Sequence, residues 1–142
     1  MDEFELIRRF FLRDNNDKSV LIGIGDDGAV IKPSPEHDLV MSTDTLIEDI
    51  HFPNCLSAED IGYRCVAVNV SDIAAMGARA RWMTLALTLP NINQEWLQKF
   101  SNGFYCAARE YGVSLIGGDT TQGQKISLTI NITGEVMPKQ AI

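Results

Sequence analysis

The sequence predicts a domain of mixed α and β structure, an α/β fold of the α+β type, on three observations. Apolar residues make up 45% of the 142 residues, which is enough for a hydrophobic core. Segments with the two-residue period of strands and segments with the 3.6-residue period of helices occur along one chain. The two kinds do not alternate strictly, so a doubly wound parallel sheet is not expected. The length fits a single domain.

The N-terminal third is predicted to hold one amphipathic helix and three short strands. Clusters of Gly, Pro and Asp separate these segments, as is typical of turns. The expected elements are a helix over 3–13 that ends at Asp14-Asn15-Asn16-Asp17, strands at Val20–Ile24, Ala29–Lys32 and Leu39–Thr43, and an irregular functional loop over 45–56.

Capping residues delimit the remaining elements. Ser57 with Asp60 resembles a capping box, and Asn93 is placed to cap another helix. The last strand alternates well, with Ile and Leu on one face and Ser, Thr and Asn on the other. The expected elements are a helix from Ser57 to about Met76 followed by Gly77, a strand at Arg79–Leu89, a helix from Asn93 through Tyr111 with Gly112 at its end, a short strand at Val113–Ile116 and a strand at Lys125–Val136.

The composition argues against several classes of protein. The formal net charge of −7 disfavours a nucleic-acid partner, which requires a basic face. No apolar run has the length of a membrane span, and the N-terminus lacks the features of a signal peptide. Cys55, Cys65 and Cys106 share no CxxC spacing and fit reduced thiols. We therefore expect a soluble cytoplasmic protein that binds neither nucleic acid nor membrane.

Five aspartates in four short motifs are the candidate functional residues. None has a lysine or arginine within four residues in sequence. If these carboxylates converge, their mutual repulsion has to be relieved, and hard divalent cations such as Mg²⁺ relieve it best. The motifs are Gly25-Asp26-Asp27-Gly28, Ser42-Thr43-Asp44-Thr45, Ser71-Asp72-Ile73 and Gly117-Gly118-Asp119-Thr120.

Simpler structural interpretations exist for three of these motifs. The Asp26-Asp27 pair and Asp119 would both suit ordinary turns. Asp119 follows an apolar strand, however, and strand ends of this kind often bind ligands. Asp44 could cap a helix, but no helix pattern starts between it and Ser57, so the capping interpretation is weak.

Asp72 is the most informative of the five. It follows a helix that is apolar nearly all round after Arg64, so the helix is expected to be buried. Burial of an unpaired carboxylate is costly, which favours a bound metal. The alternative is a salt bridge to Arg64, Arg79 or Arg81.

The run from Gly23 to Gly28 formally matches the GxGxxG fingerprint of dinucleotide-binding proteins. That fingerprint must open a helix whose N-terminus receives a pyrophosphate. Here two aspartates occupy the anion position, and Pro33 and Pro35 follow within a β-like stretch. We therefore reject this match.

Taken together, five motifs resemble the thiamine-monophosphate kinase family, part of the superfamily that includes aminoimidazole ribonucleotide synthetase. They occur in order, with compatible spacing, over nearly the whole chain. The motifs are Gly23-Ile24-Gly25-Asp26-Asp27, Ser42-Thr43-Asp44-Thr45-Leu46, His51-Phe52, the run from Asn69 to Ala78, and Gly117-Gly118-Asp119-Thr120-Thr121.

The resemblance implies a fold and an activity. The fold is an N-terminal domain over residues 1–142, with a mixed β-sheet and helices packed on one face, which binds ATP and Mg²⁺ and forms a homodimer. The activity is transfer of the γ-phosphate of ATP to thiamine monophosphate, with several Mg²⁺ ions and no covalent or acid–base residue assigned. By motif position, Asp27, Ser42, Thr43, Asp44, Asp72 and Asp119 would bind Mg²⁺, Gly118 and Asp119 would contact ATP, and His51 would contact the thiamine phosphate.

Two features depart from the family. Members are about twice as long, with a C-terminal domain that completes the site, so this chain alone is expected to turn over poorly or not at all. Asp49 stands where the family has a small residue, which affects the loop before His51.

Other functions remain open at this stage. Relatives that act in hydrogenase maturation or purine synthesis also use ATP. Selenophosphate synthetase would need a reactive Cys or selenocysteine and a Lys near the N-terminus, and the first 17 residues contain no Cys and no Lys. A non-catalytic nucleotide-binding or dimerisation module is the alternative from another class.

Overall fold

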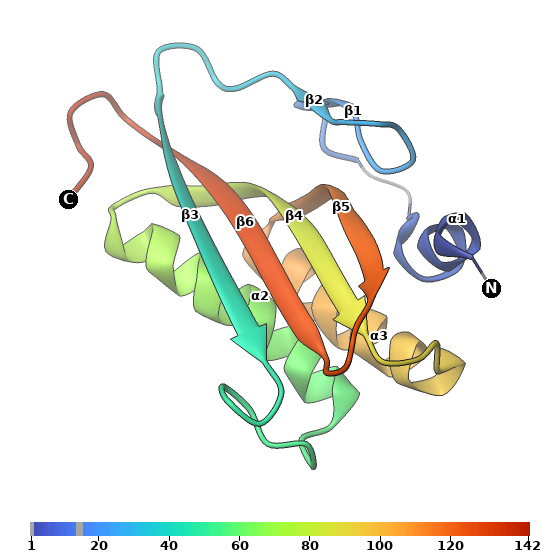
Figure 1. Ribbon diagram of the computed structural model, residues 1–142. Helices are drawn as coiled ribbons and strands as arrows, with labels where there is room; N and C mark the ends of the chain where they lie inside the picture. The colour runs from blue at the N-terminus through green and yellow to red at the C-terminus, as the bar shows by residue number, and fades with distance from the viewer. Residues whose placement is uncertain (1, 14–15) are drawn as a thin grey trace.

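A four-stranded sheet with two long helices on one face forms the centre of the molecule (Figure 1). The computed structural model describes residues 2–13 and 16–142. The strand order is β3-β6-β4-β5, antiparallel except for the parallel pair β4 and β5, so the sheet is mixed and confirms the expected fold class. The elements are α1 Glu3–Leu6, η1 Ile7–Phe11, β1 Val20–Ile22, β2 Val30–Ile31, β3 Asp38–Ile47, α2 Ala58–Ala75, β4 Arg79–Leu89, α3 Gln94–Tyr111, β5 Ser114–Gln122 and β6 Ser127–Val136.

Side-chain caps fix the ends of the two long helices, as the sequence predicts. The Ser57 hydroxyl accepts a hydrogen bond from the backbone N–H of Asp60 at 3.1 Å, and the Asn93 side chain caps α3 in the same way. Gly77 and Gly112 follow the helices with φ of 79° and 67°, a left-handed conformation that glycine adopts without steric cost. The residue types at these four positions therefore set the helix boundaries.

The core lies between the sheet and the two helices. Every second residue of β6 faces it, as the alternation in the sequence predicts. The helices cross closely because a Cβ on Gly62 or on Gly103 would collide with the backbone of the opposite helix. Fully buried side chains of this core include Val66, Ile73, Met83, Leu87, Leu97, Phe100, Phe104, Leu128, Ile130 and Ile132.

Two strands are longer than the sequence predicts. Strand β3 continues to Ile47, because it pairs with β6 over its whole length, so the expected irregular loop begins only at Glu48. Strand β5 continues through Gly117 and Gly118 to Gln122, because it pairs in parallel with β4. In both cases a neighbouring strand imposes the extended conformation on a sequence with weak strand propensity.

Two further segments flank the sheet. Strands β1 and β2 form a separate two-stranded antiparallel sheet beside the end of the main sheet where β4 begins (Figure 1). The helical segment α1 and η1 lies beside β5, where Phe11 packs edge-on against Phe100 and Phe104 of α3. The predicted helix over 3–13 is thus present within 3–11, and Asp14 and Asn15 lie outside the described residues. No helix in the described part of the chain is long and apolar enough to cross a membrane.

Candidate functional site

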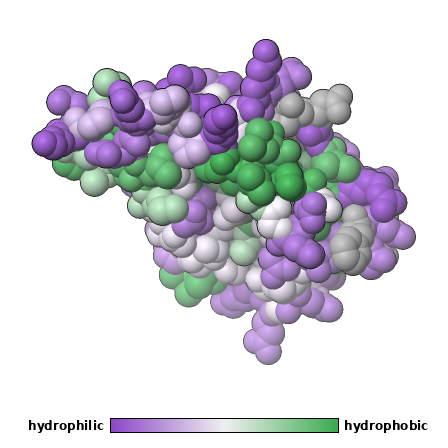
Figure 2. All heavy atoms as spheres, turned by 90° about the horizontal axis from the view of Figure 1, so that it is seen from above, coloured by the Kyte–Doolittle hydropathy of each residue, from purple (hydrophilic) through white to green (hydrophobic). Residues whose placement is uncertain are grey.

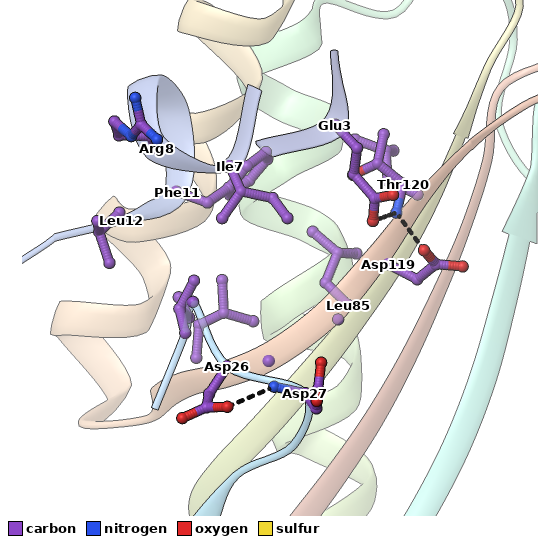
Figure 3. A pocket seen from close by; sticks show the side chains of 16 residues that line it. Glu3, Ile7, Arg8, Phe11, Leu12, Asp26, Asp27, Leu85, Asp119 and Thr120 are labelled. Atoms are coloured by element: carbon purple, nitrogen blue, oxygen red, sulfur yellow. Dashed lines mark hydrogen bonds between the residues drawn. The ribbon is translucent and has the colours of Figure 1, made fainter. Parts of the chain in front are cut away.

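A pocket of about 490 Å³ lies between the N-terminal helical segment, the turn between β1 and β2, and the edge strand β5 (Figure 3). Asp26 and Asp27 line it from the turn, Asp119 from β5, and Glu3 from α1. The only basic side chain among its described lining residues is Arg8. The pocket therefore unites two of the predicted aspartate motifs in a space that suits a small ligand.

Glycine at position 118 allows β5 to lie directly against β4. A Cβ on Gly118 would collide with the carbonyl oxygen of Leu85, whereas a Cβ on Gly117 meets nothing within 4 Å. Asp119 lies inside the strand, so the expectation of a strand end or turn was wrong. The side chain of Asp119 accepts a hydrogen bond from the Thr120 backbone N–H at 3.0 Å.

The Gly-Asp-Asp-Gly segment forms the turn of the small hairpin and does not open a helix. This confirms that the GxGxxG match is false. The carboxylate of Asp26 accepts a hydrogen bond from the backbone N–H of Asp27 at 2.9 Å, and Gly25 has a φ of 105°. The side chain of Asp27 forms part of the pocket rim (Figure 3).

Asp44 and Asp72 form a second acidic cluster, between β3 and α2. Partial desolvation raises the pKa of Asp72, and a hydrogen bond to Asp44 and the charge of Asp44 raise it further. In the described residues neither carboxylate has an ion pair with a lysine or arginine, and Arg81 is paired with Asp17 and Glu135 instead. Two facing carboxylates without a basic partner provide the oxygen ligands that a divalent cation prefers.

The expected burial of Asp72 was wrong. Helix α2 is buried on one face only, with Val68 44% exposed, and the side chain of Asp72 is exposed as well. The apolar residues past Arg64 made the helix look buried all round, but a two-layer domain covers only one side of it. The unusual feature of Asp72 is therefore its acidic neighbour.

The two clusters lie at opposite edges of the sheet. Across the strands, Asp44 is in register with Ile130, Leu85 and Gly118, so three strand spacings, roughly 14 Å, separate Asp44 from the Asp119 motif. Among the described residues, no three His, Cys, Asp or Glu side chains already form a metal-binding group. The expected convergence of all the aspartates is thus absent within one chain.

The Ser42-Thr43-Asp44 motif divides between the two faces of β3. Ser42 and Asp44 face α2, because alternate residues of the strand point to the same side. Thr43 points to the face opposite α2 and α3, which we call the open face, and its hydroxyl accepts a hydrogen bond from the Asn131 side chain at 2.8 Å. The three predicted ligands of this motif therefore do not point to one place within the chain.

His51 belongs to a compact loop at the end of β3. Its Nδ1 accepts a hydrogen bond from the backbone N–H of Ile47 at 2.9 Å, so the neutral ring carries its proton on Nε2. Asp49 in this loop has a φ of 67°, which explains the preference for a small residue there. Its carboxylate lies 3.7 Å from the amino group of Lys125. The loop can thus present an N–H donor to an anionic ligand.

Sequence reasoning missed a buried polar network beside the pocket. The carboxylate of Glu135 in β6 accepts hydrogen bonds from the Arg81 guanidinium, the Ser34 backbone N–H at 2.5 Å and the Ser34 hydroxyl at 3.0 Å. Glu135 is only 6% exposed. A signal was present in the sequence, because Glu135 interrupts the apolar end of β6.

Acid is expected to destabilise the chain through this network. Burial raises the pKa of Glu135, but the hydrogen bonds from Ser34 and the charge of Arg81 outweigh it, so this pKa lies below its usual value. Asp17 likewise has a lowered pKa, because bonds from Ser19 and other neighbours outweigh burial. Such carboxylates stabilise the fold above an unfolded pKa of about 4, and this stability is lost as the pH falls through the lower, folded pKa. Thermal melts followed by circular dichroism should therefore show Tm falling between about pH 5 and pH 3.

The variant Glu135→Gln tests the source of this acid sensitivity. We expect a shallower fall of Tm with acid and a loss of roughly 1–3 kcal/mol at pH 7, because Arg81 loses a charged partner. An acid dependence identical to that of the wild type would mean that Glu135 does not carry it.

The fold and the carboxylate clusters define a class, the N-terminal domains of AIR synthase related proteins. The model of that family, "AIR synthase related protein, N-terminal domain", matches residues 25–136. The chain belongs to this family. It is 48% identical over 133 residues to the thiamine-monophosphate kinase of Buchnera aphidicola subsp. Acyrthosiphon pisum, and the matched part is 93% of this chain and 41% of the relative.

Solved structures of thiamine-monophosphate kinases and of a related protein share this fold. Thiamine-monophosphate kinase from Stenotrophomonas maltophilia K279a superposes with a TM-score of 0.84 at 45% identity, over 89% of this chain and 40% of that one. AaThiL complexed with AMPPCP and TMP has a TM-score of 0.69 at 29% identity, over 78% and 36%. Hydrogenase maturation protein HypE in complex with ATP has a TM-score of 0.75 at 27% identity, over 96% and 41%. The chain spans about two-fifths of the length of these proteins.

Proposed function

We propose that this chain is the ATP- and Mg²⁺-binding domain of a thiamine-monophosphate kinase, an enzyme that transfers the γ-phosphate of ATP to thiamine monophosphate. The observation that carries the proposal is the pair of acidic clusters, Asp27 with Asp119 and Asp44 with Asp72, on a fold shared with these kinases. A relative solved with AMPPCP and TMP supports both substrates. Because the chain spans about two-fifths of the length of its relatives, we propose the complete activity only for a protein of their full length.

The donor set fits Mg²⁺. Asp44 and Asp72 lie together with no lysine or arginine paired to either among the described residues, and desolvation, with the hydrogen bond to Asp44 and its charge, raises the pKa of Asp72. A bound cation would offset this repulsion. The proposed Mg²⁺ ligands are those of the motifs: Asp27, Ser42, Thr43, Asp44, Asp72 and Asp119. When bound, Mg²⁺ would neutralise the phosphate charges that otherwise keep two anionic substrates apart.

The protein groups at the pocket and in the loop after β3 suit a nucleotide and a phosphate acceptor. Gly117 and Gly118 line the pocket beside Asp119 without a side chain, which would allow a ligand to approach the backbone of β5 closely. His51 can donate its Nε2 proton to a phosphate oxygen, because Nδ1 is already occupied by the backbone. The residues of this domain would thus position the substrates, with no covalent intermediate.

We also propose that two copies of the domain complete each site. One Mg²⁺ ion with ligands at 2.0–2.1 Å spans about 4 Å, so it cannot join the edges of one sheet. A twofold dimer that places β3 of one copy beside β5 of the other would bring Asp44 and Asp72 close to the partner's Asp119. Both strands lie at the edges of the sheet, where a further strand can be added.

The exposed surface is consistent with such a dimer. Apolar side chains are exposed on the hairpin and at the start of β3, and the view of this end of the molecule shows apolar side chains gathered between polar ones (Figure 2). Large exposed apolar groups of this kind mark association surfaces. They are Leu21, Ile22, Val30, Leu39 and Met41.

The test is an assay of the full-length protein that contains this chain, with Mg²⁺, ATP and thiamine monophosphate. We expect thiamine diphosphate and ADP in equal amounts. Failure with thiamine monophosphate, together with turnover of a hydrogenase-maturation or purine-synthesis substrate, would overturn the proposal. Titration of the chain itself with Mg²⁺ and AMPPCP distinguishes a nucleotide-binding domain from a purely structural module, which should bind neither Mg²⁺ nor AMPPCP.

A further inference from the structure

The turn that carries Asp26 and Asp27 has little support of its own. It joins strands of three and two residues that form a separate sheet, and such isolated hairpins are at best marginally stable. Within the described residues, the carboxylate of Asp26 bonds only to the next backbone N–H, and a Cβ on Gly25 or Gly28 would meet nothing within 4 Å. The position of the turn therefore depends on contacts outside it, among them the packing of Ile24 against the core.

Both ends of the hairpin are attached to one ion pair of the main sheet. After β2, the backbone N–H and the hydroxyl of Ser34 donate to Glu135. Before β1, Ser19 accepts a hydrogen bond from Arg81 at 3.3 Å, and Asp17 lies 3.7 Å from the same guanidinium. Arg81 and Glu135 contact each other directly, so they join the two ends of the hairpin.

A β-bulge makes this attachment possible. The register of β4 with β6 shifts between Ala80 and Trp82, which breaks the alternation of side chains. Arg81 and Trp82, neighbours in sequence, therefore both bond to the Ser19 hydroxyl, with the Trp82 indole N–H at 2.8 Å. The Arg81 guanidinium also lies 4.9 Å from the centre of the Trp82 ring.

The hydrogen bonds of Ser19 are then complete. Its hydroxyl donates to Asp17 at 2.6 Å and accepts from two side chains of β4, while Asp17 also accepts from the Ser114 hydroxyl of β5 at 3.0 Å. A network in which the members satisfy one another holds a single geometry. The hairpin is thus fixed to three strands of the main sheet.

We propose that Arg81 and Glu135 are positioning residues that hold the Gly-Asp-Asp-Gly turn at the rim of the pocket, so that Asp27 is preorganised for its metal. Neither side chain is among the pocket-lining residues, so both act through the hairpin. This inference rests on the proposed function for the role of Asp27, but the attachment of the hairpin can be tested without it.

The test compares Glu135→Gln and the milder Ser19→Ala with the wild-type chain. Glu95→Gln is the matched control, because it removes one carboxylate from the exposed ion pair with Lys99 on α3. Hydrogen exchange, resolved by segment, should be accelerated at least about tenfold more over residues 20–32 than over the cores of β4, β6 and α3 in both test variants, because a global loss of stability accelerates exchange in both regions alike. Calorimetric titration with Mg²⁺ and AMPPCP should give about tenfold weaker binding in both, and no change in the control.

Excess Mg²⁺ separates a positioning role from a structural one. It should restore AMPPCP binding in Glu135→Gln, whose metal ligands are intact, and should not restore it in Asp27→Asn. Unchanged exchange in the hairpin, or equally faster exchange throughout the sheet, would overturn the inference. Normal binding in a variant with a loosened hairpin would also overturn it while leaving the proposed function intact. If the wild-type chain binds no AMPPCP, the prediction that this chain alone binds a nucleotide is wrong. Hydrogen exchange over residues 20–32 then decides whether the ion pair of Arg81 and Glu135 holds the turn.

Discussion

The variant Asp72→Asn is expected to stabilise the metal-free chain while abolishing its response to Mg²⁺. The pKa of Asp72 is raised in the folded state, so its charge is disfavoured there, and stability falls as the pH rises through the folded pKa. Removing the charge should raise Tm at pH 7 by a few degrees, on the order of 1–3 °C given the exposure of the side chain. If the proposed function holds, the same change in a protein of full length should lower kcat/KM about a thousandfold or more, because the proposed metal site loses a ligand.

A control variant on the same helix should change Tm in the opposite direction. Glu59 is exposed in the first turn of α2, where a negative charge favours the helix, so Glu59→Gln should lower Tm slightly and leave activity unchanged. Differential scanning fluorimetry with and without Mg²⁺-AMPPCP measures both effects. A metal-free Asp72→Asn chain that is less stable than wild type would show that Asp44 and Asp72 do not repel each other in the fold.

The variant Gly118→Ala is expected to have the largest effect on folding of any single methyl group added near the site. The new Cβ would collide with the Leu85 carbonyl oxygen, so β5 must move away from β4. We expect a loss of roughly 2–4 kcal/mol in the free energy of unfolding, together with loss of AMPPCP binding, because Asp119 moves with the strand.

Gly117→Ala is the matched control for this change. Its Cβ meets nothing within 4 Å and its φ is not in the left-handed region, so it should alter stability by less than about 1 kcal/mol. Urea unfolding followed by tryptophan fluorescence compares the two variants. Equal midpoints would contradict the close approach of β5 to β4.

Local signals were enough to predict much of the fold. Asn93 and Gly112 delimit α3, Ser57 begins α2, and Arg79–Leu89 is a strand with the predicted bounds. These features depend on side chains that act on their own backbone within a few residues. The lengths of strands β3 and β5 were underestimated, because pairing with distant strands extends them over residues of weak strand propensity.

The sequence singled out the aspartates but not their arrangement, and their roles as ligands stay predictions. In the structure Asp27 and Asp119 share one pocket, and Asp44 and Asp72 contact each other. Strand order decides that these pairs lie at opposite edges, and no local pattern encodes it. Arg81 was considered only as a partner for Asp72, since the bulge that turns it toward Ser19 leaves no mark in the sequence.

In the proposed dimer, each phosphotransfer site takes Asp119 from one copy and Asp72 from the other. The most direct measurement is co-expression of two full-length variants, Asp119→Asn and Asp72→Asn, each inactive alone. In a mixed dimer one site would carry both changes and the other would be intact. With random pairing, half of the dimers are mixed, so we predict about a quarter of the wild-type rate of thiamine diphosphate formation. A co-expressed mixture as inactive as each variant alone would contradict the shared site, because it would mean that each site is built within a single chain.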